Sequence, residues 1–265
     1  MVWWGVHLSS LHIYPIKSCG GLSLERASLD AQGLAHDRRF MLVDDAGVFV
    51  TQREEPAMAL FHCGFDGDDV MVSHDAMGAI HIPLHGDGER VEVRVWKDKV
   101  SAILCPEASA YFRRALDRSV RLVRLPEDAT RVANPARAGA GHLVSFADGY
   151  PLLLTSKASL ADLEARAGRE FSMRRFRPNL VVSGLPAWAE DELTSFTVGD
   201  VAMRAVKPCE RCAITTVDPL TGGRDAEPLR TLASFRKHDG KVRFGVNVVH
   251  DDPGELEVGQ PIELG

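Results

Sequence analysis

The sequence predicts a mainly β protein with a few helices, an α+β fold. The first half of the chain contains short strand-like stretches at regular spacing, with Gly and Asp turns between them and no intervening helix. Such spacing is typical of an antiparallel barrel or sandwich. Helical periodicity is confined to a few short segments. The 265 residues, 45% of them apolar, suit one or two domains with a real core.

The strands of the first half follow from alternation and turns. Residues 6–16 alternate between apolar and polar side chains. Residues 39–43 and 48–51 flank a short turn that contains Gly47, which predicts a hairpin. Further strands are expected at residues 70–72, 79–82 and 91–95.

One helix and an irregular connection close this half. Pro106 suits a first helical position, and apolar residues from Ala108 to Leu116 then recur on one face. Residues 126–141 are rich in Ala, Pro, Gly and Arg without any period. We therefore place the domain boundary there, with domains at residues 1–125 and 126–265.

The second half resumes with a buried strand and a helix. Residues 151–155 form the strand, Ser156 is a plausible helix cap, and the helix follows with its apolar face. A strand at residues 179–182 and a hairpin at residues 196–203 with a Gly-Asp turn come next. The remaining strands are expected at residues 242–249 and 258–264.

Composition excludes several classes of protein. A net charge of −6 argues against a general binder of nucleic-acid backbones. No apolar run approaches the length of a membrane span, and the N-terminus lacks the features of a signal peptide. Five cysteines are few and odd in number for this length. That usage fits a reducing compartment, and we expect a cytoplasmic protein without membrane attachment.

Residues 207–219 carry the most informative chemistry, because Arg211 directly precedes Cys212. A fixed cation biases a thiol toward thiolate, the form that attacks electrophiles or binds soft metals. We expect the two cysteines of this segment, Cys209 and Cys212, in a loop. Residues 213–217 are rich in β-branched side chains and read as a strand that ends at Asp218.

The Cys209-x-x-Cys212 spacing has four interpretations. A closed zinc site needs four ligands, whereas the other cysteines are scattered and His81 and His85 alternate as in a solvent-facing strand. A dithiol redox pair expects a helix directly after the cysteines. The two thiols also fit ordinary buried cysteines. The fourth interpretation is a single thiolate ligand to the metal of a cofactor.

The stretch from Cys209 to Gly222 resembles the signature of MOSC domains, molybdenum-cofactor proteins whose thiolate ligand is the cysteine after an arginine. Residues 14–21 resemble the opening of the N-terminal β-barrel domain that accompanies MOSC in one branch. That branch includes the mitochondrial amidoxime-reducing component and its bacterial counterparts. Further matching stretches cover the chain in order, at residues 33–43, 51–56, 176–179 and 244–247.

The resemblance implies an N-terminal β-barrel-like domain, a MOSC β-barrel domain and a bound molybdenum–molybdopterin cofactor. Cys212 is then the metal ligand and the catalytic residue, while Cys209 has no assigned role. An acidic protein needs local cations and polar groups to hold the phosphate and the pterin. The candidate cofactor-binding residues are Lys17, Ser18, Arg39, Ser156, Arg177, Asn179, Arg211 and Cys212.

The implied function is a molybdenum-dependent oxidoreductase, independent of pyridoxal phosphate, that reduces N-hydroxylated small molecules such as amidoximes, hydroxylamines and N-hydroxylated bases. The sequence has no iron–sulfur cysteine pattern, no haem-attachment motif and no Gly-rich dinucleotide fingerprint. Electrons should therefore come from a separate ferredoxin-like, cytochrome b5-like or flavin reductase protein. The alternative is a carrier of molybdenum cofactor or sulfur, with a persulfide on Cys212.

Overall fold

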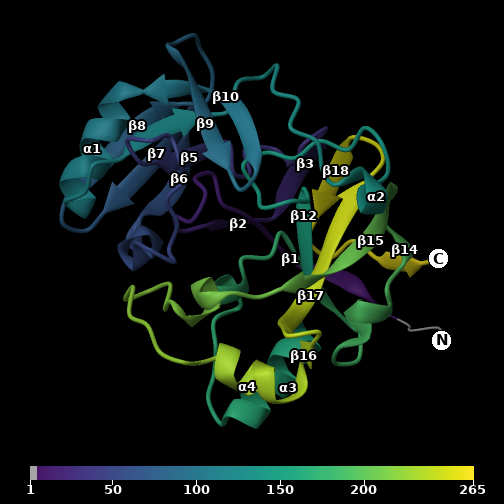
Figure 1. The fold of residues 1–265 in the computed structure, drawn as a ribbon. Coiled ribbons are helices and arrows are strands. Elements are labelled where there is room, and N and C mark those ends of the chain that lie inside the picture. The colour runs from purple at the N-terminus through teal and green to yellow at the C-terminus, as the bar shows by residue number, and fades with distance from the viewer. Residues whose placement is uncertain (1–4) are drawn as a thin grey trace.

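The computed structural model describes residues 5–265, and their largest feature is a nine-stranded sheet (Figure 1). Its main path runs β19-β14-β15-β17-β12-β13-β1-β2, and β16 pairs with β17 beside it. Neighbouring strands are antiparallel except β12 and β13, which are parallel. The strands are β1 (His7–Ile13), β2 (Leu22–Leu24), β12 (Leu152–Ser156), β13 (Leu180–Ser183), β14 (Ser195–Val198), β15 (Val201–Glu210), β16 (Lys237–His238), β17 (Lys241–His250) and β19 (Ile262–Leu264).

Three smaller sheets complete the described part of the chain. The first has the order β5-β11-β10-β9, with β5 (Phe40–Val43), β9 (Arg90–Val95), β10 (Asp98–Cys105) and β11 (Arg121–Arg124). The second joins β6 (His62–Asp66), β7 (Asp69–His74) and β8 (Gly78–Pro83). The third joins β18 (Gly254–Glu257), β3 (Arg26–Asp30) and β4 (Gly33–Leu34). The mainly β class predicted from the sequence is confirmed.

The sheets do not separate at residue 125. Strand β1 pairs with β13, and β3 pairs with β18, so the first strands of the chain lie within the second half of the fold (Figure 1). The apolar side chains Leu8, Leu11 and Ile13 of β1 join the same buried cluster as Leu180 of β13. This long-range pairing places the segment after β1, with Lys17 and Ser18, beside the second half.

The helices begin where the local signals predict. Helix α1 (Pro106–Leu116) starts at Pro106 and packs against β11 and β8. Helix α3 (Lys157–Ala167) follows Ser156, whose hydroxyl oxygen accepts the N–H of Ala158 at 3.2 Å. Two further helices, α2 (Pro135–Ala138) and α4 (Leu229–Phe235), were not predicted, and α2 lies inside the expected irregular connection. No helix within residues 5–265 is long and apolar enough to cross a bilayer.

The predicted strand at residues 213–217 is wrong, because Ala213–Thr216 forms a short 3-10 helix. The hydroxyl of Thr215 donates to the carbonyl of Cys212 at 3.0 Å, and that of Thr216 donates to the carbonyl of Ala213 at 2.7 Å. Such local bonds offer the backbone an alternative to a sheet ladder. The other 3-10 helices are Pro56–Leu60, Met173–Phe176 and Ala189–Glu192.

Candidate active site

A cavity opens where the end of β15 meets the segments that follow β1 and precede β12 and β13. Six of the eight residues predicted from the sequence line it: Lys17, Ser18, Arg177, Asn179, Arg211 and Cys212. These residues are separated by up to almost two hundred positions in the chain. The pairing of β1 with β13 brings the first two to the others.

Arg39 and Ser156 lie elsewhere. The guanidinium of Arg39 donates to both carboxylate oxygens of Asp30, at 2.7 and 2.6 Å, beside a separate cavity. Ser156 is fully buried and caps α3. The neighbouring Arg38 lines the candidate site instead of Arg39. Arg38 has a left-handed backbone with φ of 50°, which sets its side-chain direction and which no sequence pattern indicated.

Cys212 is an exposed thiol within this cavity. It lies two residues after the end of β15, where the register against β17 shifts between Pro208 and Glu210. Such irregularities redirect side chains and are common next to active sites. Cys209, which we expected in a loop, belongs to the end of β15 and lines the same cavity.

Arg211 fixes a positive charge between the two cysteines. Its guanidinium contacts Cys209 Sγ at 2.9 Å and donates to the carbonyl oxygen of Phe176 at 2.6 Å. Its buried Nε has no hydrogen-bond partner among the described residues. The structure places Arg211 in the cavity, and its contact with Cys209 was not predicted from the sequence.

A closed zinc site is not formed in the part of the chain that the structure describes. No group of three or more His, Cys, Asp or Glu side chains within residues 5–265 is arranged to hold a metal ion. All five cysteines are free thiols. A metal carried by a cofactor and held by one thiolate needs no such cluster, because the cofactor supplies the remaining ligands.

Two arginines stack on one buried tyrosine beside the cavity. The guanidinium carbons of Arg38 and Arg177 lie 4.6 and 4.2 Å from the centroid of the Tyr14 ring. Arg38 pairs with buried Asp37 at 2.5 Å, and this carboxylate outweighs the effect of burial and raises the pKa of Arg38. Burial and the nearby Arg38 charge lower the pKa of Arg177 to about 10. A bound anion would relieve this repulsion.

Arg177 also keeps an unused donor. Its Nη1 donates to the carbonyl oxygen of Cys19 at 2.6 Å, while the buried Nη2 has no partner among the described residues. Most buried side-chain polar atoms have a hydrogen-bond partner, so an unpaired guanidinium donor beside a cavity suits an anionic ligand. Guanidinium matches phosphate in geometry and charge.

Lys17 and Asn179 are already committed to protein groups. Lys17 Nζ donates to the carbonyl oxygen of Phe146 at 2.8 Å and to Asp148 Oδ1 at 2.5 Å. Burial lowers the pKa of Lys17, and Asp148 partly offsets this. Asn179 Oδ1 accepts from Arg38 at 3.0 Å and from the Leu153 N–H at 3.2 Å. Asn179 therefore orients Arg38, and its carbonyl oxygen already accepts two hydrogen bonds from protein groups.

The cavity fits a phosphate-bearing ligand with a soft metal. Arg177 and Arg211 supply buried N–H groups without partners, Arg38 adds a fixed charge, and Cys212 supplies an exposed thiol. Phosphate is a preferred partner of guanidinium groups, and thiolates bind soft metals. The residues that are present therefore suit a molybdenum–molybdopterin cofactor, which combines these two features.

Gly21 leaves room for the buried Tyr14 ring on which Arg38 and Arg177 stack. A Cβ at this position would lie 2.4 Å from the Tyr14 ring and 2.8 Å from the Ile13 carbonyl oxygen. We expect Gly21→Ala to lower the free energy of unfolding by about 1–3 kcal/mol, because the buried ring has no space to move. Urea denaturation measures this, with Gly149→Ala as the control, since its Cβ would meet no atom within 4 Å. Equal stability of the two variants would contradict the packing argument.

Comparison with known proteins gives two family matches. Residues 5–119 match the MOSC N-terminal beta barrel domain, and residues 141–263 match the MOSC domain. Mitochondrial amidoxime-reducing component 1 of Homo sapiens is 33% identical over 279 residues, covering 97% of this chain and 82% of the relative. Its counterpart from Mus musculus is 34% identical over 277 residues, with the same two coverages.

A second type of relative covers the same range. Mitochondrial amidoxime reducing component 2 of Bos taurus is 33% identical over 275 residues, covering 96% of this chain and 82% of the relative. The YUAD protein from Bacillus subtilis has a TM-score of 0.46 at 12% identity, covering 97% of this chain and 94% of that one. That structural likeness is too low to carry an argument. The sequence matches show that the chain belongs to the amidoxime-reducing component family and combines a MOSC N-terminal domain with a MOSC domain.

Proposed function

We propose that this protein is a molybdenum-cofactor-dependent oxidoreductase that reduces N-hydroxylated compounds, among them amidoximes, hydroxylamines and N-hydroxylated bases. The observation that carries the proposal is the exposed Cys212 thiol in a cavity where Arg177 and Arg211 hold unpartnered buried N–H groups. The names of the relatives support the same reaction class.

The residues divide into a metal ligand and an anion cradle. Cys212 would hold the metal through its thiolate, and Arg177, Arg38 and Arg211 would hold the phosphate. When bound, the molybdenum cofactor supplies the two-electron chemistry that removes oxygen from an N–O group. The Phe176 ring stacks on Phe244 with centroids 3.9 Å apart, which anchors the segment that presents Arg177.

Asp148 is a hydrogen-bond acceptor in this site rather than a proton donor. Partial desolvation opposes its ionisation although the side chain is 64% exposed, and Lys17 and the indole N–H of Trp96 outweigh that effect and hold the pKa of this carboxyl below its usual range. It is therefore ionised at neutral pH. Its charge partly offsets the lowering of the Lys17 pKa by burial and fixes the Lys17 side chain at the cavity wall, so this pair shapes the site.

We further propose that electrons come from a separate protein. Purified protein loaded with cofactor and supplied with NADH and benzamidoxime alone should show no turnover, because the chain has no dinucleotide fingerprint. Turnover should begin when a reductase and a small redox protein are added. NADH consumption followed at 340 nm measures this. Direct NADH oxidation by the isolated chain would contradict the proposal.

The alternative function, a carrier of sulfur or cofactor, is separated from the enzyme by elemental analysis. Molybdenum close to one atom per chain supports the oxidoreductase. Labile sulfur on Cys212 without metal supports the carrier. The proposed location is the cytoplasm, where reducing conditions suit a chain whose five cysteines are all free thiols.

A further inference from the structure

Arg53 places a guanidinium with free donors at the wall of the candidate site. Its side chain lines the cavity and is 23% exposed. Among residues 5–265 its guanidinium makes no hydrogen bond, and its one ion-pair contact is Glu54 Oε1 at 3.9 Å. Lys17 and Arg38 differ from it, because each already forms an ion pair at 2.5 Å, with Asp148 and Asp37 respectively. Arg53 is thus available to an incoming ligand.

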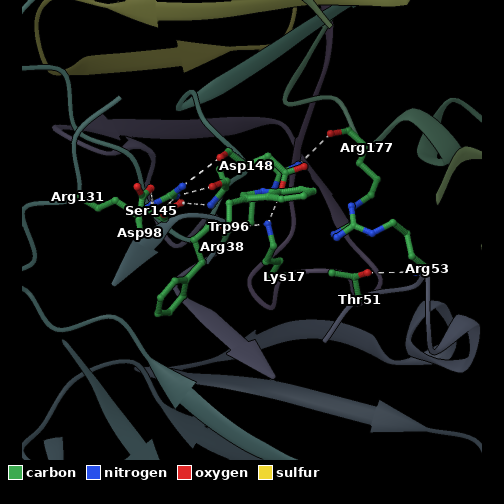
Figure 2. Close-up of polar contacts among 12 residues, drawn as sticks. Lys17, Arg38, Thr51, Arg53, Trp96, Asp98, Arg131, Ser145, Asp148 and Arg177 are labelled. Atoms are coloured by element: carbon green, nitrogen blue, oxygen red, sulfur yellow. Dashed lines mark hydrogen bonds and ion pairs between the residues drawn. The ribbon is translucent and has the colours of Figure 1, made fainter. Parts of the chain in front are cut away.

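An aromatic platform holds this guanidinium in position. The Arg53 guanidinium carbon lies 4.7 Å from the centroid of the Trp96 ring and 5.6 Å from that of Phe49. The two rings lie 5.1 Å apart. Figure 2 shows Arg53 directed toward Trp96, which lies next to Lys17 and Asp148. Stacking on an aromatic face orients a guanidinium and leaves its N–H edge free to donate.

Trp96 is itself held in an unusual backbone conformation. It lies between β9 and β10 with φ of 54°, a left-handed region that bulky residues rarely adopt. Its indole N–H donates to Asp148 Oδ1 at 3.1 Å, and yet the residue is 47% exposed. Strained residues of this kind persist where the surroundings over-determine them, and they cluster at functional sites.

The backbone beneath Arg53 is also fixed. The N–H groups of Glu54 and Glu55 donate to the Thr51 carbonyl oxygen at 3.0 and 2.9 Å. From the second half of the chain, Arg224 donates to the carbonyl oxygens of Gln52 and Arg53 at 2.5 and 2.6 Å. A preorganised donor loses little entropy when it binds a ligand, which favours affinity.

We propose that Arg53, stacked on Trp96, forms an anion-binding subsite that takes the carboxylate or phosphate group of an N-hydroxylated substrate. This inference rests on the proposed function and extends it to a substrate class. The phosphate of the cofactor and the anion of a substrate could both bind this guanidinium. The experiment is therefore designed to separate these two sources.

The kinetic test compares two substrates on the cofactor-loaded enzyme with an artificial electron donor. Benzamidoxime is neutral, and 4-carboxybenzamidoxime carries the anion. The ratio of kcat/KM for the carboxylated over the neutral substrate should fall by about 10-fold or more in Arg53→Gln, the loss typical of a charge-assisted hydrogen bond. Arg53→Lys should recover only part of it. Arg90→Gln is the matched control, because Arg90 is an exposed arginine beside another cavity.

Two outcomes for the Arg53→Gln variant, one kinetic and one in its cofactor content, would overturn the proposed subsite. An unchanged ratio in Arg53→Gln would show that the guanidinium does not contact the substrate anion. Loss of bound molybdenum and pterin in this variant would assign Arg53 to the phosphate of the cofactor. Trp96→Leu should lower the ratio as Arg53→Gln does, whereas Trp96→Phe keeps a ring for stacking and should retain most of it.

A binding measurement tests the subsite independently of the reaction. Isothermal titration calorimetry with 4-carboxybenzamide and benzamide uses ligands without a reducible N–O bond. The wild type should bind the carboxylated ligand about 10-fold tighter or more, and both Arg53→Gln and high salt should remove this preference. The same preference for the carboxylated ligand in the wild type and in Arg53→Gln would overturn the proposed subsite. If the loaded wild type reduces neither amidoxime, the proposed function fails while the calorimetry still decides the subsite.

Discussion

Cys212→Ser is expected to reduce amidoxime turnover to background. A hydroxyl is a poor ligand for a soft metal although its volume is close to that of a thiol. Changes in the outer shell of metal sites already cost about 10–100-fold, so loss of the ligand itself should exceed about 100-fold. Because Cys212 is exposed, the fold should tolerate the change. Turnover per chain, molybdenum content and the thermal unfolding midpoint measure these effects separately.

Cys209→Ser is the matched control for this prediction. Cys209 lines the same cavity and its Sγ contacts Arg211 at 2.9 Å, but it does not follow the arginine in the sequence. This variant should keep substantial activity, with a modest loss if Arg211 becomes less well fixed. Equal loss of activity in the two serine variants would instead indicate that the cysteines act together as a dithiol or metal-binding pair.

Arg38→Ala is expected to reduce cofactor occupancy strongly. A charge-assisted hydrogen bond contributes about 1.5–3 kcal/mol, which corresponds to about a 10- to 150-fold change in affinity. The change also removes the partner of Asp37, which is buried and keeps only its bond to the Tyr14 N–H at 2.8 Å. Unfolding is therefore measured as well, and Arg38→Lys is included because it keeps the charge beside Asp37. Pterin fluorescence and elemental analysis report the occupancy.

Arg39→Ala is the control for Arg38→Ala, because the two residues are neighbours in the chain. Arg39 pairs with half-exposed Asp30 away from the site, and such pairs contribute about 0–1 kcal/mol. Its cofactor occupancy should stay close to that of the wild type. The reverse pattern, with occupancy lost in Arg39→Ala and kept in Arg38→Ala, would contradict the position of Arg38 in the structure.

Features set by local chemistry could be predicted from the sequence. Ser156 caps α3 and Pro106 begins α1 because caps and first-turn prolines act on their own helix. The Phe196–Met203 hairpin follows from its Gly-Asp turn. The adjacent Arg211 indicated a thiol biased toward thiolate, and the resemblance to MOSC domains selected Cys212 as the proposed ligand.

Features set by long-range contacts or unusual backbone could not be predicted in this way. The pairing of β1 with β13 joins segments about 170 positions apart, and no local pattern encodes it. The choice of Arg38 over Arg39 depends on a left-handed backbone angle. The role of Asn179 depends on its contacts with Arg38 and Leu153, which only the fold creates. Residues 213–217 were misread because threonines that favour strands also form local hydroxyl–carbonyl bonds.

The rate of benzamidoxime reduction with an artificial donor, measured against molybdenum per chain across preparations of different loading, tests the central claim most directly. We expect the rate to rise in proportion to molybdenum, to approach zero without it, and to stay at background in Cys212→Ser. A rate independent of molybdenum would contradict the proposal. So would a fully loaded protein that leaves benzamidoxime unreduced.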